Sequence, residues 1–128
     1  MVLTVNIGNT HICVAGYGKE GKRFSSKLST LPVCTADEYA MKLTDLLALY
    51  EQRSATITGA IVASVVPGLT GRMVQGLKRL SPARVLTVGP GLKSGLSLRI
   101  DDPAQLGAEL LCAAVGALQL APPPLVLV

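Results

Sequence analysis

The residues with the clearest capacity for chemistry lie at the start of the chain, where a run of strand-forming residues ends at Gly8-Asn9-Thr10. Gly8 has no Cβ to hold a ligand away from the backbone, Asn9 tolerates left-handed dihedral angles, and Thr10 adds a hydroxyl donor beside exposed backbone N–H groups. Such a turn can hold phosphate oxygens. A second apolar run, Ile12 to Tyr17, follows, and Gly-Asn between two strands also forms ordinary hairpin turns. The pattern alone therefore leaves both interpretations open.

Two further side chains could take part in proton transfer. His11, the only histidine, directly follows the turn, and we favour contact with the turn or with a nucleotide over catalysis. Glu109 begins an apolar segment, where a helix dipole favours a negative charge whatever the function. The number and spacing of the cysteines fit neither a disulfide framework nor a zinc site. We interpret them as reduced core residues of a cytoplasmic protein; they are Cys13, Cys34 and Cys112.

The composition limits the class of protein. The chain has 128 residues, of which 49% are hydrophobic and only 3% aromatic. The core must therefore consist of aliphatic residues, as in sheets covered by helices, and the scarcity of rings argues against nucleic-acid binding by base stacking. The net charge is +4, which suits an anionic ligand such as a nucleotide. The start of the chain lacks the pattern of a secretory signal. The apolar segment Leu110 to Ala121 is too short to cross a bilayer, and we interpret it as a buried helix.

Hydrophobic patterns and turn signals predict an α/β fold around these residues. Thr35-Ala-Asp-Glu38 is a capping box that opens a helix. The continuous apolar run Gly59 to Val66 indicates a central parallel strand covered on both faces, and the short turn at Gly18 to Gly21 makes the first three strands an antiparallel meander. The expected strands are residues 1–7, 12–17, 22–31, 59–66 and 84–88, with a last one beginning at Leu125, and the expected helices are 36–50, 69–80 and 104–120.

Five segments, taken in order, resemble the type III pantothenate kinases. They are Asn6-Ile-Gly-Asn-Thr-His11, Thr35-Ala-Asp-Glu-Tyr39, Ser64-Val-Val-Pro67, Val88-Gly-Pro-Gly91 with Lys93-Ser-Gly95, and Asp101-Asp-Pro103 with Gly107-Ala-Glu109. The resemblance implies an actin-like (ribonuclease H-like) domain, with a mixed sheet and helices on both faces. In the family the strand matching Leu125 to Val128 leads into a second phosphate loop and another domain. Residues 1–128 are therefore expected to be the N-terminal actin-like kinase domain, truncated before the second phosphate motif.

The resemblance also implies a reaction, the transfer of the γ-phosphoryl group of ATP to the hydroxyl of pantothenate in the first step of coenzyme A biosynthesis. It implies ATP with Mg²⁺, a monovalent cation (K⁺ or NH₄⁺) and a homodimer at full length, with no nucleic-acid or membrane partner. By position, the ATP phosphates would meet Asn6, Ile7, Gly8, Asn9, Thr10, His11, Ile12 and Cys13, and the metal would meet Asn6. Pantothenate would lie along Ile100, Gly107, Ala108, Glu109 and Leu110, with Glu109 as general base.

Four of these positions depart from the family pattern. Asn6 stands in place of an Asp and loses the negative charge suited to organising a hydrated Mg²⁺ ion. Glu109 also stands in place of an Asp, which moves the carboxylate by about 1 Å, a misplacement that can cost about 100-fold in rate. Leu110 replaces an Arg that would bind the pantothenate carboxylate, and Ile100 stands where the family often has a Tyr.

The departures keep other functions under consideration. The main interpretation is the N-terminal half of a type III pantothenate kinase, inactive on its own. Asn6, Leu110 and the missing second phosphate loop instead favour a non-catalytic nucleotide-binding or regulatory remnant of the same fold. A third interpretation is another kinase of the superfamily, against which the Ser64-Val-Val-Pro67 and Val88-Gly-Pro-Gly91 segments argue.

Overall fold

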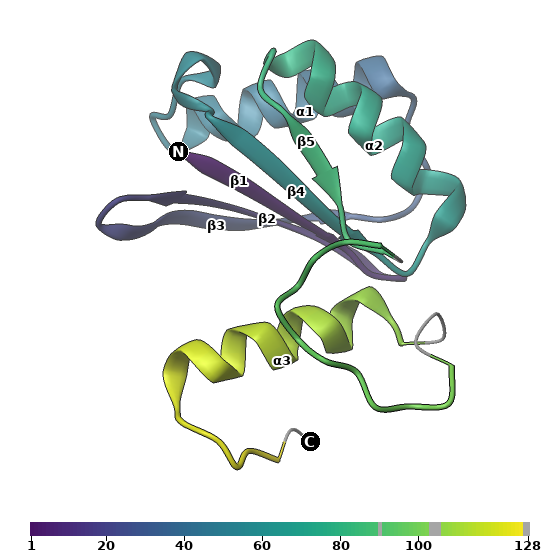
Figure 1. Cartoon of the computed structure of the whole chain (residues 1–128). Helices are drawn as coiled ribbons and strands as arrows, with labels where there is room; N and C mark the ends of the chain where they lie inside the picture. The colour runs from purple at the N-terminus through teal and green to yellow at the C-terminus, as the bar shows by residue number, and fades with distance from the viewer. Residues whose placement is uncertain (90, 103–105, 127–128) are drawn as a thin grey trace.

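A mixed sheet of five strands, in the order β3-β2-β1-β4-β5, lies at the centre of the fold (Figure 1). The computed structural model describes residues 1–89, 91–102 and 106–126. The strands are β1 (Val2–Ile7), β2 (His11–Gly18), β3 (Gly21–Ser29), β4 (Gly59–Ser64) and β5 (Val85–Thr87). The helices are α1 (Ala36–Leu49), α2 (Pro67–Leu80) and α3 (Ala108–Leu120), with a 3-10 turn at Ser54–Thr56. The predicted α/β fold class is confirmed.

Strand β1 joins the antiparallel and parallel halves of the sheet. It pairs with β2 in antiparallel register from Val2 opposite Tyr17 to Ile7 opposite Ile12. On its other side it pairs with β4 in parallel, ending with Ile7 beside Ser64. The β2–β3 pair is antiparallel and the β4–β5 pair is parallel. The predicted meander that continues into two parallel strands is thus confirmed.

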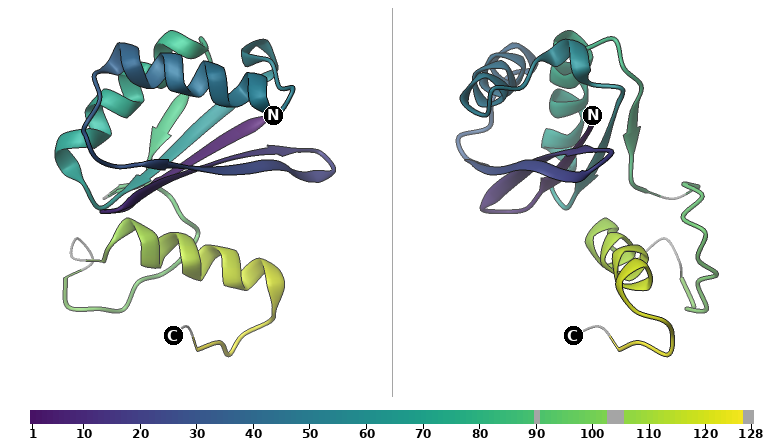
Figure 2. Two further views of the ribbon diagram at one scale, coloured as in Figure 1. Left: turned by 180° about the vertical axis from the view of Figure 1, so that it is seen from behind. Right: turned by 90° about the vertical axis from the view of Figure 1, so that its left-hand side faces the viewer.

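Helices α1 and α2 cover one face of the sheet and α3 lies on the other (Figure 2). Side chains of a strand alternate between the two faces. On β1, Leu3, Val5 and Ile7 are at most 2% exposed and form a core cluster with apolar residues of α1 and α2. The core is aliphatic, as the composition predicted, apart from Tyr39 and the stacked rings of Phe24 and Tyr50. No helix of the described residues is long and apolar enough to span a membrane.

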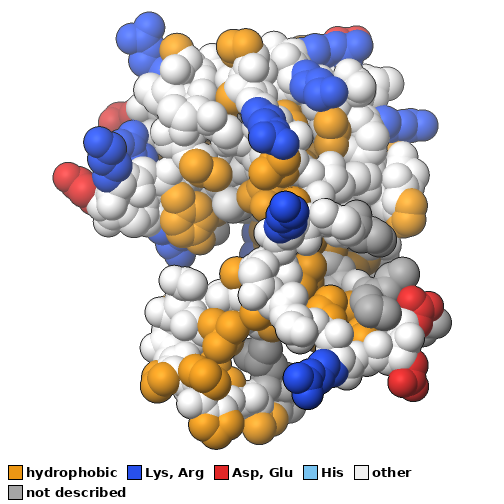
Figure 3. All heavy atoms as spheres, viewed as in Figure 1, with side chains coloured by type: hydrophobic (Ala, Val, Ile, Leu, Met, Phe, Trp, Pro, Cys, Tyr) orange, Lys and Arg blue, Asp and Glu red, His pale blue; other side chains and the backbone are white. Residues whose placement is uncertain are grey.

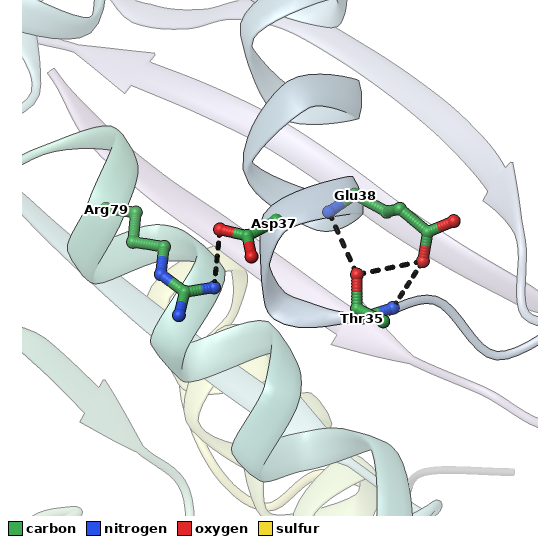
Figure 4. A network of polar contacts seen from close by, with 4 residues as sticks. All are labelled: Thr35, Asp37, Glu38 and Arg79. Carbon is green, nitrogen blue, oxygen red and sulfur yellow. Dashed lines mark hydrogen bonds and ion pairs between the residues drawn. The ribbon is translucent and has the colours of Figure 1, made fainter.

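Helix α1 begins with the predicted capping box. Thr35 Oγ1 accepts a hydrogen bond from the Glu38 amide at 3.3 Å, and the Glu38 carboxylate accepts from the Thr35 amide at 2.7 Å and from its hydroxyl at 2.9 Å (Figure 4). The bond from the Thr35 backbone, followed by the one from its side chain, lowers the pKa of Glu38 because both favour the ionised carboxylate. The neighbouring Asp37 pairs with Arg79 of α2 at 2.8 Å, an exposed ion pair that adds little stability.

Three expectations for the last quarter of the chain are wrong. Helix α3 begins at Ala108 rather than Ala104, because Gly107 has an extended conformation (φ −60°, ψ 143°); residues 103–105 lie outside the described part. Helix α3 has no buried residue, and Leu120 is 89% exposed. Hydrophobic side chains, in orange, accordingly lie open on the lower part of the molecule, where α3 lies in the same view (Figure 3). Leu125 and Val126 belong to no strand, since they lie beyond α3, away from the sheet (Figure 1). Residues 127–128 lie outside the described part.

Smaller differences occur at the ends of other elements. Strand β3 ends at Ser29 and β4 ends at Ser64, earlier than expected. Helix α2 begins at Pro67 rather than Leu69. Proline lacks an N–H group and is favoured in the first turn of a helix, where that group has no intrahelical acceptor. Pro67 therefore starts α2 rather than merely ending the strand before it.

We expect Gly76→Ala to destabilise the packing of α2 on α1. A Cβ at Gly76 would lie 3.0 Å from the Ala36 carbonyl oxygen and 3.0 Å from Tyr39 Cβ, so the two helices would have to move apart. The free energy of unfolding, measured with urea, should fall by about 1 to 3 kcal/mol. In the control Gly71→Ala, on the same helix, the new Cβ meets no atom within 4 Å, and the free energy should rise by about 0.5 to 1 kcal/mol. Equal effects of the two changes would contradict this packing.

Candidate active site

A cavity of about 500 Å³ lies on the face of the sheet that carries α3. Asn6 of β1, Cys13 of β2 and Glu109 of α3 all line it. Asn6 and Cys13 are register partners on adjacent antiparallel strands, so their side chains lie on the same face of the sheet. Glu109 reaches the cavity from the first turn of α3. The structure therefore brings together an amide, a thiol and a carboxylate from the two ends of the chain; we call this space the site cavity.

The turn between β1 and β2 is tight and is held from both sides. The Gly8 amide donates to the His11 carbonyl at 2.9 Å, and a Cβ at Gly8 would lie 3.2 Å from that same oxygen. Glycine is thus needed for close approach rather than for a positive φ. Asn9 does not have a left-handed conformation, so that part of the expectation is wrong. None of Gly8, Asn9 and Thr10 has a positive φ.

Thr30, just after β3, anchors this turn from a buried position. It is 2% exposed, its hydroxyl donates to the Gly8 carbonyl at 2.8 Å, and its amide donates to the Thr10 carbonyl at 3.0 Å. On the other side, the Val65 amide, following β4, donates to the Ile7 carbonyl at 3.0 Å. The carbonyls of Ile7, Gly8 and Thr10 therefore all accept hydrogen bonds from within the protein. Asn9, Thr10 and His11 remain exposed at the tip.

The side chains of the predicted phosphate-binding residues lie in three different places. Ile7 and Ile12 are fully buried in the core on the α1 and α2 side, so only their backbone could reach a phosphate. The side chains of Asn9, Thr10 and His11 are exposed but do not line the site cavity, whereas Asn6 and Cys13 do. A nucleotide that contacts both the exposed tip of the turn and the site cavity must extend over the end of β1.

The predicted acceptor-binding residues also separate. Glu109 lines the site cavity, and Ala108 lines a neighbouring cavity of about 450 Å³. Gly107 caps α3 and is exposed. Ile100 and Leu110 are 46% and 61% exposed, and neither lines either cavity. Of the predicted acceptor-binding residues, Glu109 is thus the one that lines the same cavity as Asn6.

The oxygen atoms that the site cavity offers suit a cation that keeps most of its water or phosphate ligands. No group of three or more His, Cys, Asp or Glu side chains that could hold a metal occurs in the described residues. The site cavity offers the amide oxygen of Asn6 and the carboxylate of Glu109. Mg²⁺ usually binds one or two protein oxygens together with water and substrate phosphates. These two side chains fit that pattern, with the phosphates of a nucleotide supplying the remaining charge.

Two residues of the site were not identified from the sequence. Thr30 carries no local signal, because its role depends on hydrogen bonds to a turn far away in the sequence. Cys112, one turn after Glu109, also lines the site cavity; the helical spacing of Glu109 and Cys112 could have indicated it. Partial desolvation raises the pKa of the Cys112 thiol above its usual value, although the residue is exposed overall. The expectation that Cys112 is a core residue is therefore wrong, because α3 buries none of its residues.

Comparisons with known proteins agree with the motifs. The model of a family described as type III pantothenate kinase matches residues 2–128. A type III pantothenate kinase from Rhodospirillum centenum is 37% identical over 129 residues, which cover 100% of this chain and 49% of that protein. Another, from Bifidobacterium longum subsp. infantis, is 36% identical over 119 residues, which cover 91% and 46%. The chain thus spans about half the length of these curated relatives.

Similarity to a solved structure supports the fold class but carries no information about function. The solved structure is a crystal structure from Porphyromonas gingivalis, named as a candidate N-acetylglucosamine kinase. It aligns with a TM-score of 0.51 at 16% identity, covering 68% of this chain and 33% of that protein. The agreement is in the arrangement of strands and helices, in line with the predicted fold class.

We expect Thr30→Val to loosen the turn that follows β1. The change keeps the side-chain shape but removes the donor to the partly buried Gly8 carbonyl, which should lower the free energy of unfolding by about 1 to 2 kcal/mol. Urea unfolding measures this loss. Thr30→Ser retains the hydroxyl and is the matched control, with a smaller effect expected. If the valine variant were as stable as the original chain, the hydrogen bond to Gly8 would not hold the turn.

Proposed function

The chain belongs to the type III pantothenate kinase family, and we propose that it is the N-terminal half of an enzyme that phosphorylates pantothenate with ATP. The observation that carries this proposal is the shared cavity of Asn6 and Glu109. One residue comes from the strand that precedes the phosphate-sized turn, and the other is a carboxylate on the helix start that the family motifs assign to the acceptor. This shared lining supports a proposal in which phosphate donor and acceptor meet in one space.

The proposed roles follow from the chemistry of each group. The Thr10 hydroxyl and backbone N–H groups of the exposed residues at the tip of the turn donate to phosphate oxygens. Asn6 orients the phosphates through its amide. Glu109 accepts the proton of the acceptor hydroxyl as that oxygen attacks the γ-phosphorus, and ADP leaves with the electron pair of the broken P–O bond. A divalent cation bound with the nucleotide supplies charge neutralisation on the phosphates.

The remaining expectations from the family complete the proposal. We infer that the nucleotide is bound with Mg²⁺, that a monovalent cation (K⁺ or NH₄⁺) takes part, and that the full-length enzyme is a cytoplasmic homodimer. A second phosphate loop and a second domain would come from the part of the enzyme that corresponds to the other half of its relatives. Phosphoryl transfer depends on holding donor, metal and acceptor in line, and the second domain would close the cleft over the γ-phosphate.

A second candidate function is a domain that binds nucleotide or a regulatory partner without catalysis. The observation that favours it is the weakness of the acceptor side. Leu110 has no donor and lines neither cavity, and Asn6 lacks the charge of an Asp. Such a domain would keep the turn held by Thr30 and therefore bind nucleotide. Activity of a completed enzyme separates the two functions.

We expect the 128-residue chain alone to show negligible pantothenate kinase activity, because one side of the cleft is absent. Joining it to the C-terminal half of the Rhodospirillum centenum kinase should restore turnover. A coupled assay for ADP with pantothenate, MgATP and K⁺ measures both. Turnover by the chain alone would show that a second domain is not needed. A folded chimera that binds ATP but never turns over would favour the non-catalytic function.

In that chimera, we expect Glu109→Gln to lower kcat by about 100-fold to 10,000-fold, the usual loss when a general base is removed. Glutamine keeps the size and hydrogen-bonding capacity of the side chain, so affinity for ATP should change little. Steady-state kinetics and a separate nucleotide titration distinguish the two effects. Glu20→Gln, at the exposed β2–β3 turn, is the control and should leave kcat unchanged. Undiminished turnover in Glu109→Gln would leave Glu109 as a helix-start carboxylate only.

A further inference from the structure

A further cavity lies between the parallel strands of the sheet and helix α3. It has a volume of about 430 Å³, which is within the usual range for small-molecule pockets, and we call it the helix cavity. Strands β4 and β5 supply Ile61 and Leu86 to its wall, and α3 supplies Val115 and Gly116. Most of the wall is aliphatic, and none of the described lining residues is Asp or Glu. The helix cavity is therefore suited to an apolar chain.

Two consecutive residues of the loop after β5 give this aliphatic wall a polar end. Lys93 and Ser94 both line the helix cavity. Among the described residues, the ion pair joins Arg79 to Asp37, and Lys93 takes part in none. The Ser94 hydroxyl oxygen accepts from the Leu96 amide at 3.2 Å, which leaves the hydroxyl hydrogen to donate. One cation and one hydroxyl donor are thus available to an anionic group.

Helix α3 gains little from packing on the sheet because this cavity lies between them. The helix has no buried residue. Leu111 and Val115 line the cavity and are only partly buried, as is Ile61 of β4. An alkyl chain in the helix cavity would remove apolar surface of both walls from water. Such a ligand would therefore stabilise the position of α3.

We propose that the helix cavity binds a medium-chain alkyl carboxylate, with the chain between α3 and the strands and the carboxylate at Lys93 and Ser94. A carboxylate has one charge and two oxygens, which match one ammonium group and one hydroxyl donor. A neutral alcohol of the same length would contact the same aliphatic wall but lose the attraction of Lys93. The proposal concerns binding alone and does not depend on the kinase function.

Calorimetric titration of the 128-residue chain with butanoate, hexanoate and octanoate tests the aliphatic wall. Each added methylene that enters the cavity should tighten binding by about fourfold. Octanol tests the charge. Octanoate should bind about fivefold more tightly than octanol, a modest ratio because Lys93 is exposed and water screens its attraction. No saturable binding of octanoate, no dependence on chain length, or equal affinity for octanol and octanoate would overturn the proposal.

Filling the helix cavity from α3 locates the bound chain. A Cβ at Gly116 meets no atom within 4 Å, so Gly116→Leu places a side chain in the cavity without a backbone clash. The affinity for octanoate and for octanol should fall by about tenfold or more, as when two or more methylenes lose their contact. Gly71→Leu is the control, because its Cβ is equally free and α2 lies on the other face of the sheet (Figure 2). Unchanged affinity for octanoate in folded Gly116→Leu would overturn the proposal.

Removing the cation tests the polar end of the helix cavity. Lys93→Met keeps an aliphatic stem and should weaken octanoate binding by about fivefold while sparing octanol. Lys93 is exposed, so its replacement does not endanger folding. Lys78→Met, at an exposed position of α2, is the matched control and should change neither affinity. Equal octanoate affinities in Lys93→Met and the original chain would refute the assigned position of the carboxylate.

Hydrogen exchange shows whether the ligand holds α3 against the sheet. Opening of the helix would release the ligand, so octanoate at about 100 times its Kd should slow exchange of the α3 amides by up to about 100-fold. In Gly116→Leu the same concentration should have little effect. Unchanged α3 exchange in the original chain with octanoate bound would place the ligand elsewhere and overturn the proposal.

Discussion

The register of β1 between β2 and β4 is the constraint on which the rest of the structure depends. Successive residues of a strand point to opposite faces, so a slip by one residue would expose Leu3, Val5 and Ile7 and bury Asn6. The core with α1 and α2 opposes that slip because it would return these three side chains to water. The same register fixes Asn6 opposite Cys13. The register of β1 thus determines both the packing of the core and the position of the candidate site residue Asn6.

The two faces of the sheet are covered unequally, and this affects the site. Helices α1 and α2 share a buried core with the sheet, but α3 has no buried residue. A helix that buries little apolar surface gains little stability from packing, and such elements are the first to open. Helix α3 carries Glu109, whereas Asn6 lies on β1, which pairs with a strand on each side and packs into the core. A ligand that contacts both walls of the site cavity would therefore stabilise α3 in place, since binding favours the state that binds.

The sequence predicted the features whose signals are local. The capping box of Thr35 and Glu38 and the turn after β1 each depend on residues a few positions apart, and the parallel pairing of β4 and β5 follows from the strand, helix, strand order. The exposure of α3 was missed because apolar composition predicts burial without saying what will cover the helix. The role of Thr30 was missed because its hydrogen bond to Gly8 spans 22 positions. The position of Ile100 and Leu110 outside both cavities could not be predicted from their places in the motifs.

The charge balance of the site cavity gives the replacement at position 6 a physical meaning. An Asp there would place a second carboxylate in the space that Glu109 already lines, and two such charges close together repel each other unless a cation lies between them. With Asn6, the described lining of the cavity includes one acidic side chain, that of Glu109, and has less repulsion for a cation to offset. The same change leaves fewer charges to draw a cation in. In a nucleotide bound as proposed above, the phosphates would therefore gain less charge neutralisation from a cation held at position 6.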